Sequence, residues 1–501
     1  MLACLHTAAL FGVDAVPVAV EVDVAGGGLP GITMVGLPDA TVRESRDRVR
    51  TAIRNSGFPA PVGRVTVSLA PADLRKVGAA FDLPIALGML SAAGIVPDRT
   101  GRDLTIVGGL SLDGAVPPMH GVLPIAVAAR REGRRGLLFP AGNLAEASIV
   151  SDLPLYPVSS LTDAVRLLSS SDTPPVAPLA GTAQAALADD DLSEVYGQAE
   201  GRRAIEIAAA GGHHLLFSGP PGSGKTMLAR RLPTLLPPLS FDEALVVTAI
   251  HSVAGLVPGG HGLVAQRPFR APHHTCSDIA LVGGGSTPRP GELSLAHGGV
   301  LFLDELPEFS RRVLETLRQP LETGTVQIAR VQRSVSFPAR VMLVGAMNPC
   351  PCGFHGDVHG RCHCPPPLVE RYQRRLSGPL RDRFDLGVAV QAVPWSDISG
   401  ATPRESSAVV RERVEAARAR QSARQGCLNA HLEGRALRAQ CALDSQGQAL
   451  LAAAVTKLHL SVRGVSRVLR VARTVADVAG SRAVETAHVA EALQFRVPDR
   501  G

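Results

Sequence analysis

The sequence predicts an α/β protein with a phosphate-binding core and a helical C-terminal region. A glycine-rich loop lies between an apolar strand and a helix within 214–232. Two further apolar segments, 300–303 and 341–346, have the length of buried parallel strands. Beyond residue 395 the apolar residues recur every three or four positions, as they do in helices that bury one face.

Composition and breaks in periodicity divide the 501 residues into four parts. The first combines alternating strands at 16–24 and 64–69 with an amphipathic helix at 39–55. The second is rich in Ser, Pro, Ala, Thr and Asp and has no periodicity, which predicts a linker. The parts are an α/β domain at 1–168, a linker at 169–191, an α/β core at 192–394 and a helical lid at 395–501. The lid is expected to contain helices at 406–425, 446–458 and 465–480.

The chain has 45% hydrophobic and 19% charged residues, which excludes wholesale disorder. Its net charge of +6 is too small for this length to identify a partner. No secretory signal or transmembrane segment is evident, so we expect a cytoplasmic protein with reduced thiols and no membrane partner. Only three of the 51 basic residues are lysines: Lys76, Lys225 and Lys457.

A phosphate-binding motif occupies residues 219–226. It reads G-x-x-x-x-G-K-T and stands in the strand–loop–helix context that the motif requires, which disfavours a glycine-rich turn without a ligand. Glycines let backbone N–H groups turn toward phosphates, and the helix N-terminus adds its dipole. We therefore expect ATP to bind at Gly219, Pro220, Pro221, Gly222, Ser223, Gly224, Lys225 and Thr226.

Lys225 and Thr226 have distinct tasks in such a loop. Lys225 supplies a mobile charge to the phosphates, for which a planar guanidinium is no substitute. The Thr226 hydroxyl is expected to bind Mg²⁺.

Two carboxylates, Asp304 and Glu305, end the apolar segment Val300–Leu303. By itself such a segment is more often an ordinary strand that enters a loop. Beside a phosphate loop, however, carboxylates at this place hold Mg²⁺ and polarise the attacking water. We assign the first role to Asp304 and the second to Glu305.

Longer strings around these motifs resemble the magnesium-chelatase-like AAA+ ATPases of the YifB/ComM type. The strings are PGELSLAHGGVLFLDE at 290–305, LRQPLE at 317–322, GAMN at 345–348 and NPCPCG at 348–353. The resemblance extends from residue 1 to about 498 and implies an AAA+ P-loop core with a helical lid. It also implies Mg²⁺-dependent ATP hydrolysis at the subunit boundaries of a homohexameric ring.

The resemblance implies roles for further residues. Asn348 would be the sensor 1 residue that orients the attacking water. Arg383 would be the arginine finger for the neighbouring subunit's γ-phosphate, and Arg463 would be the sensor 2 residue of the lid, with Arg467 in reserve. Because arginine is common in this chain, ordinary surface positions stay open as the alternative. Tyr196 lies where such ATPases contact the adenine, and a hinge role explains it almost as well.

In this branch of AAA+ proteins, insertions at two places line the central pore. The second, at 322–338, predicts a β-hairpin with strands at 327–329 and 334–337. Arg330 and Arg333 are expected near its tip. They either contact the phosphates of DNA or are exposed arginines of a solvated hairpin. The first insertion, at 268–285, contains two residues that either contact a pore ligand or pack within the loop, His273 and His274.

Four cysteines lie within 15 residues, and they are Cys350, Cys352, Cys362 and Cys364. Four thiolates form a soft, tetrahedral ligand set, and we expect a structural Zn²⁺ because four protein ligands would close the site. A disulfide or redox pair and free thiols are the alternatives. Nearby histidines could replace a thiolate, and they are His355, His359 and His363.

The segments GLPGITMVGL at 28–37 and RKVGAAFDLPIA at 75–86 resemble the N-terminal domain of the same family, which is similar in fold to the Lon protease domain and to the ribosomal S5-like fold. A Lon-type peptidase needs a serine nucleophile activated by a lysine. Ala79 and Ala80 stand where the serine is expected, so we expect no peptidase activity. Lys76 would be structural or would contact nucleic acid.

Together these observations predict an ATP-driven ring that acts on single-stranded or branched DNA. The resemblance implies a competence-associated helicase or branch-migration factor for DNA taken up by the cell. A protein-remodelling ATPase and a chelatase-type motor that drives metal insertion into a porphyrin stay open as alternatives. Three lid arginines are expected to face a neighbouring subunit or DNA, and they are Arg418, Arg420 and Arg424.

Overall fold

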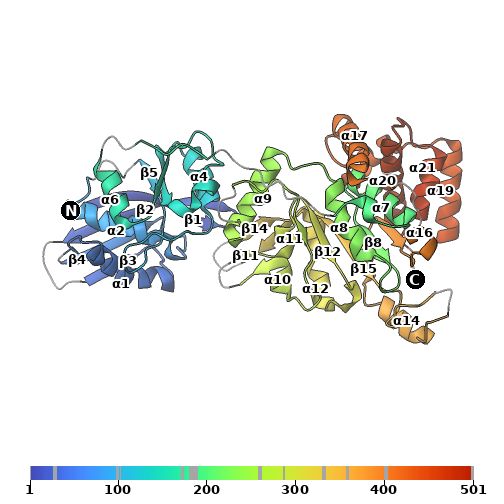
Figure 1. Cartoon of the computed structure of the whole chain (residues 1–501), viewed down its shortest axis with the longest axis horizontal. Helices are drawn as coiled ribbons and strands as arrows, with labels where there is room; N and C mark the ends of the chain where they lie inside the picture. The colour runs from blue at the N-terminus through green and yellow to red at the C-terminus, as the bar shows by residue number, and fades with distance from the viewer. Residues whose placement is uncertain are drawn as a thin grey trace.

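A computed structural model describes residues 2–25, 31–61, 63–97, 101, 103–170, 174–179, 190–257, 262–285, 288–329, 334–356, 360–399 and 404–497. Figure 1 shows an N-terminal α/β part, a central α/β part and a helical C-terminal part, which follow one another along the long axis. The α/β class and the helical C-terminal region are confirmed.

The N-terminal part contains a seven-stranded sheet in the order β3-β4-β2-β1-β5-β6-β7. Its strands are β1 (Leu2–Phe11), β2 (Asp14–Ala25), β3 (Gly31–Val35), β4 (Arg64–Ala70), β5 (Leu104–Ile106), β6 (Gly136–Pro140) and β7 (Leu155–Val158). Its helices are α1 (Ala40–Asn55), α2 (Asp82–Ala92), α4 (Val122–Arg131), α5 (Leu144–Ala147) and α6 (Leu161–Ser169). The predicted strands at 16–24 and 64–69 and the helix at 39–55 are confirmed, because alternate residues of β2 are buried and Asp39 caps α1 through Val42 N–H.

Lys76 lies in the core of this N-terminal part with no exposed surface. Its ammonium group donates to the carbonyl oxygens of Leu69 and Pro71, and the Leu69 contact is 2.8 Å long. Burial lowers the pKa of Lys76. Of the two roles expected for Lys76, the structural one is confirmed and contact with nucleic acid is excluded.

The central sheet is parallel and has the order β16-β8-β15-β12-β9. Its strands are β8 (Leu215–Ser218), β9 (Phe269–Arg270), β12 (Val300–Leu303), β15 (Met342–Met347) and β16 (Leu386–Ala389). Apolar side chains fill both faces, as expected when helices cover a parallel sheet on each side. The helices are α7 (Ala199–Gly211), α8 (Lys225–Leu235), α9 (Phe241–Ala254), α10 (Asp278–Val282), α11 (Glu292–Leu295), α12 (Arg311–Thr316), α13 (Arg318–Thr323), α14 (Pro366–Gln373) and α15 (Gly378–Arg381).

Two short hairpins extend from this core. One pairs β10 (Gly283–Gly284) with β11 (Arg289–Pro290). The other pairs β13 (Thr325–Ile328) with β14 (Val335–Pro338), which confirms the predicted hairpin. Arg330 and Arg333 lie outside the described residues, between these two strands.

The lid is helical, and the helices predicted from 406, 446 and 465 onward are confirmed. Helices α17 and α20 pack against α7 of the core, and their apolar residues join one core cluster with β8 and β15. The lid helices are α16 (Trp395–Ser399), α17 (Ser407–Gln425), α18 (Gly434–Gln440), α19 (Ser445–Leu458), α20 (Val462–Val478) and α21 (Thr486–Gln494).

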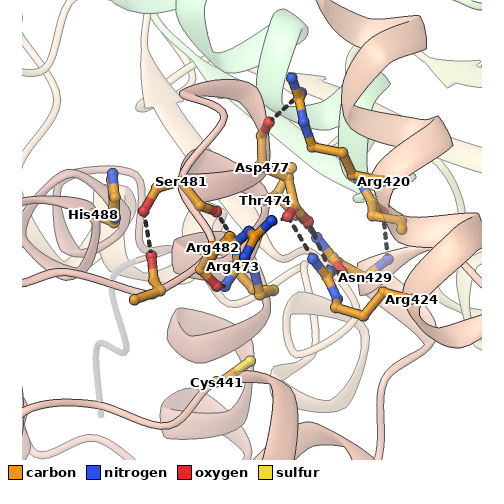
Figure 2. A network of polar contacts seen from close by, with 12 residues as sticks. Arg420, Arg424, Asn429, Cys441, Arg473, Thr474, Asp477, Ser481, Arg482 and His488 are labelled. Carbon is orange, nitrogen blue, oxygen red and sulfur yellow. Dashed lines mark hydrogen bonds and ion pairs between the residues drawn. The ribbon is translucent and has the colours of Figure 1, made fainter.

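A buried polar network joins α17 to α20 (Figure 2). Asp477 is 1% exposed and accepts two bonds from Arg424, at 2.6 and 2.9 Å, and one from Arg473 at 2.9 Å. Asn429, which is fully buried, donates to the same carboxylate at 2.8 Å. These bonds satisfy a charge that would be costly to bury alone.

The lid arginines bind groups of their own chain. Arg424 is committed to Asp477, and Arg418 donates through Nε to the carbonyl oxygen of Ala209 in α7 at 2.8 Å. Arg418 and Arg424 are therefore held by groups of their own chain, and contact of the lid arginines with a subunit or DNA stays a prediction. The more exposed Arg420 also donates inward, to the Asp477 carbonyl oxygen at 2.9 Å.

The N-terminal part contacts the core through α9. Ser252 on this helix donates from its hydroxyl to the Glu146 carboxylate and accepts at its carbonyl oxygen from Gly121 N–H at 3.2 Å. Leu245 and Ala249 of α9 also pack against the apolar cluster of the N-terminal part. Within the described residues, no helix has the length and apolar character needed to cross a membrane.

We expect Asp477→Ala to destabilise the lid by about 3–5 kcal/mol, because it leaves the buried Arg473 without a charge partner. The free energy of unfolding is measured by urea denaturation followed by circular dichroism. Asp163→Ala is the matched control, since Asp163 pairs with an exposed arginine at 3.5 Å and contributes about 0–1 kcal/mol. Equal effects of the two substitutions would contradict a stabilising role for the network.

Candidate nucleotide site and cysteine cluster

The candidate site forms where three parallel strands end together. Ser218 of β8 lies opposite Met347 of β15, and Gly345 of β15 lies opposite Leu303 of β12. The next residues along the chain are therefore neighbours at the carboxyl edge of the sheet. They are Gly219 of the phosphate loop, Asn348 and Asp304.

Glycine is required at particular points of the phosphate loop. Gly222 and Gly224 have φ values of 73° and 96°, a region that favours glycine. A Cβ atom on Gly219 would lie 2.0 Å from the Val390 carbonyl oxygen, so a side chain there would displace β16 or the loop. The loop leads directly into α8, whose first N–H groups have no partners within the helix.

Lys225 connects the phosphate loop to Asn348. Its ammonium group donates to the carbonyl oxygens of Gly219 and Pro220, at 2.7 and 2.9 Å, and to Asn348 Oδ1 at 3.1 Å. Burial lowers the pKa of Lys225, and the charges of Asp304 and Glu305 oppose this effect. The structure thus brings together a cation from α8 and an amide from the end of β15.

Thr226 and Asp304 form the other half of the site. The Thr226 hydroxyl donates to Asp304 Oδ2 at 2.8 Å, and Asp304 Oδ1 accepts from Glu305 N–H at 2.9 Å. The Ser223 hydroxyl is buried and has no hydrogen-bond partner within the described part of the chain. The Thr226 hydroxyl beside the Asp304 carboxylate fits a Mg²⁺ ion. The unpartnered Ser223 hydroxyl and the first N–H groups of α8 fit the phosphates of a nucleotide.

Glu305 extends from the same strand end with φ 51°. Its carboxylate is 3.1 Å from Nδ1 of His274, a residue of the first insertion. The His274 ring also lies against the His273 ring, with centroids 4.1 Å apart and the ring planes tilted by 33°. Sequence reasoning left pore contact and loop packing open for His274 and missed its contact with Glu305, since no local pattern links the two residues.

The segment before α7 reaches the phosphate loop through Gln198. Its side chain donates to the carbonyl oxygens of Ser223, at 2.9 Å, and Gln391, at 2.6 Å. The neighbouring Tyr196 ring is covered by the Arg404 guanidinium, 3.8 Å from the ring centroid. Sequence reasoning did not connect Gln198 with the phosphate loop, and the role of Tyr196 at the adenine or at a hinge stays a prediction.

Arg383 lies at the opposite edge of the sheet. It precedes β16, whose first residue, Leu386, is opposite the first residue of β8. The phosphate loop follows the last residue of β8, so the length of that strand, about 10 Å, separates Arg383 from it. Arg383 pairs with Glu322, just before the β13–β14 hairpin.

Two lid arginines accompany Arg383. Its pKa is lowered by burial and then by the nearby charges of Arg463 and Arg318. Arg463 is exposed in the first turn of α20, whereas Arg467 is buried. Arg467 donates at 3.1 Å to the Phe384 carbonyl oxygen and to Asp382 Oδ1, so it holds the segment that carries Arg383.

The four cysteines of the cluster meet directly after β15. Their sulfur atoms all lie within 4.8 Å of one another, and three of the separations are 3.3, 3.7 and 3.8 Å. A tetrahedral ion with Zn–S bonds of about 2.3 Å holds its sulfurs about 3.8 Å apart. No disulfide joins the cysteines in the part of the chain that the structure describes, and the peptide N–H of Phe354 and the Cys350 thiol lower the pKa of Cys352 to about 6. Of the neighbouring histidines, His359 lies outside the described residues.

Comparisons with known proteins agree along the whole chain. Residues 20–143, 191–398 and 404–496 match the families described as "Subunit ChlI of Mg-chelatase", "Magnesium chelatase, subunit ChlI" and "Magnesium chelatase, subunit ChlI C-terminal". The chain is 45% identical to "Uncharacterized protein YifB" of Salmonella typhimurium, over 100% of this chain and 98% of that protein.

Two further relatives carry functional names. The chain is 45% identical to "Competence protein ComM" of Haemophilus influenzae, over 99% of this chain and 97% of that protein. It is 26% identical to "Magnesium-chelatase 38 kDa subunit" of Rhodobacter capsulatus, over 42% of this chain and 62% of that protein.

We expect Lys225→Ala to lower ATP turnover by about 100-fold, because it removes a preorganised cation from the phosphate site. Turnover is measured by phosphate release at saturating MgATP. Lys457→Ala is the matched control, since Lys457 is exposed on α19, and its turnover should equal that of the wild type. Wild-type turnover by Lys225→Ala would show that the loop is not the hydrolytic site.

Proposed function

The chain belongs to the magnesium-chelatase ChlI-like family of AAA+ ATPases, and from this premise we propose that it is a ring-forming motor that uses ATP hydrolysis to move DNA strands. The observation that carries the proposal is the joining of Lys225, Thr226 and Asp304 with Asn348 at one sheet edge. The full-length relative named a competence protein supports DNA as the substrate.

ATP supplies the phosphoryl group for this chemistry, and Mg²⁺ neutralises its charge. Residues 219–226 hold the phosphates through backbone N–H groups and the Lys225 ammonium. Thr226 and Asp304 hold the Mg²⁺ ion. Glu305 accepts a proton from the attacking water, and Asn348 orients that water from the neighbouring strand end.

The position of Arg383 supports assembly into a ring. Because it lies at the amino edge, it is directed away from the phosphate site of its own chain. An arginine there acts on a phosphate only when a second copy brings its carboxyl edge alongside. We assign Arg383 as the arginine finger of a homohexamer, with Arg463 beside it as the sensor 2 residue at the same boundary.

The β13–β14 hairpin is the proposed DNA contact. Arg330 and Arg333 follow its first strand in the sequence and would contact backbone phosphates, so that single-stranded or branched DNA is bound without a reading of its sequence. The hairpin follows Glu322, the partner of Arg383. A change at a subunit boundary can thus reach the pore through one short segment.

The cysteine cluster is proposed to hold a structural Zn²⁺ ion. The thiol separations fit a tetrahedral ion, and four protein ligands leave no open position for catalysis. In this assignment Cys350, Cys352, Cys362 and Cys364 are the ligands.

The family likeness to a magnesium chelatase subunit also favours a second function, in which the ring drives insertion of a metal ion into a porphyrin. The chelatase relative covers only 42% of this chain, whereas the competence relative covers 99%. DNA is therefore the preferred substrate, and porphyrin metallation and protein remodelling are alternative outcomes of the first test below.

We expect single-stranded, forked and four-way-junction DNA to stimulate ATP turnover, and the protein to displace or migrate strands. The double variant Arg330→Ala/Arg333→Ala should bind DNA more weakly. The slope of its binding constant against salt concentration, on logarithmic scales, should fall by the equivalent of about two phosphate contacts. Fluorescence anisotropy across a salt series measures both, with the exposed Arg166→Ala as control. Stimulation by a protein or a porphyrin, with none by DNA, would replace the proposed substrate.

We expect Arg383→Ala and Glu305→Gln each to be inactive alone and to regain turnover when mixed. In a mixed ring, the Arg383→Ala subunit keeps its own Glu305 and receives Arg383 from a Glu305→Gln neighbour. Light scattering with MgATP confirms that mixed rings form, and phosphate release measures turnover. Mixed rings without activity would show that Arg383 does not act across the boundary.

A further inference from the structure

The cysteine cluster is built onto the phosphate site at two points. The first is the chain itself, because Cys350 follows Asn348 and Pro349 directly after β15. Met347, the last residue of that strand, accepts at its carbonyl oxygen from Gly219 N–H at 3.2 Å. Asn348 in turn accepts from Lys225. Cys350 is fully buried, so the first ligand of the cluster is part of the packed strand end.

The second point is a contact between two loops. Gly353, which follows Cys352, has φ 85°, and a Cβ atom there would lie 2.5 Å from Cδ of Pro221. The cysteine loop therefore lies directly against the phosphate loop, with no room for a side chain between them. A displacement of Gly353 removes the support of Pro221 on that side.

The segment is also held from outside the cluster. Gln373 in α14 donates to the Pro349 carbonyl oxygen at 3.0 Å, and His355 N–H donates to Cys350 Sγ at 3.3 Å. These contacts fix the first cysteine pair. The second pair, Cys362 and Cys364, lies beyond the loop tip and meets the first through sulfur contacts of 3.7 and 3.8 Å. Thiol contacts of this length are weak, so a bound ion is the group that can hold the two pairs together.

We propose that a Zn²⁺ ion held by these four cysteines acts as a clamp on the phosphate loop, so that metal occupancy sets the rate of ATP hydrolysis. Thiols that are still protonated release their protons to solvent when the ion binds, and no redox step is involved. With the ion bound, the cysteine loop is rigid and supports both Asn348, through the chain, and Pro221, through Gly353. Without it, the loop after Cys350 loosens while the parallel sheet, which does not use the ion, stays folded.

This inference rests on the proposed ATPase function but has a readout of its own. Full-length protein purified without chelator is expected to contain one zinc ion per chain by plasma mass spectrometry. Cys362→Ser should lose the ion, bind a fluorescent ATP analogue more weakly and turn over ATP about tenfold more slowly, since small displacements of catalytic groups cost 10–100-fold. Its main thermal transition should stay within a few degrees of the wild type.

Two further variants separate the clamp from a general folding defect. Cys427→Ser removes a half-buried lid cysteine outside the cluster and should leave zinc content and turnover unchanged. Gly353→Ala should keep the zinc ion but lower turnover, because its Cβ atom presses on Pro221.

The outcomes are distinct. Wild-type protein without zinc would overturn the metal site. Zinc-free Cys362→Ser with normal nucleotide affinity and turnover would overturn the clamp. Protein that binds zinc and the ATP analogue but never hydrolyses ATP would instead overturn the proposed function, and the analogue affinity would still report on the clamp.

Discussion

The catalytic half of this molecule depends on the hydrogen-bonded register among β8, β15 and β12. Parallel pairing places Ser218 opposite Met347 and Leu303 opposite Gly345, so the residues that follow these strands converge on one edge. Lys225 meets Asn348, and Thr226 meets Asp304, because of this register. A shift by one residue would exchange the side chains packed on the two buried faces and would separate these groups, so the apolar core and the candidate site are specified together.

The opposite edge of the same sheet has a different chemistry. There arginines gather beside the carboxylates of Glu322 and Asp382, and after burial the charge of Arg463 lowers the pKa of Arg383. Arg467 ties the segment before β16 to α20, and the buried network around Asp477 ties α20 to α17. These bonds connect the lid to the segment that carries Arg383.

The cysteine loop and the first insertion bring distant segments to the carboxyl edge. His274 contacts Glu305, and Gly353 lies against Pro221. Each contact joins a residue of the proposed hydrolytic site to a segment outside that site. For Glu305 the segment is the first insertion, which is expected to line the pore, and for Pro221 it is the loop that carries the four thiols. A displacement of the first insertion or of the cysteine loop would therefore displace residues of the phosphate site. The N-terminal part contacts the core through α9 and Glu146, and its Phe11 and Val13 pack against the apolar cluster that includes the β13–β14 hairpin.

The sequence by itself determined the local features of this protein. The phosphate loop, the carboxylates after Val300–Leu303, the hairpin around 322–338 and the lid helices were predictable, because each depends on residues close together in the chain. The cysteine spacing was visible for the same reason. Only the tertiary structure decided the strand order, the burial of Lys76 and the commitment of Arg424 to Asp477. It also decided the contacts of His274 with Glu305 and of Gly353 with Pro221. Strand pairing and core packing set these contacts between distant segments. Local periodicity in the sequence does not predict them, because it depends only on residues that are close together in the chain.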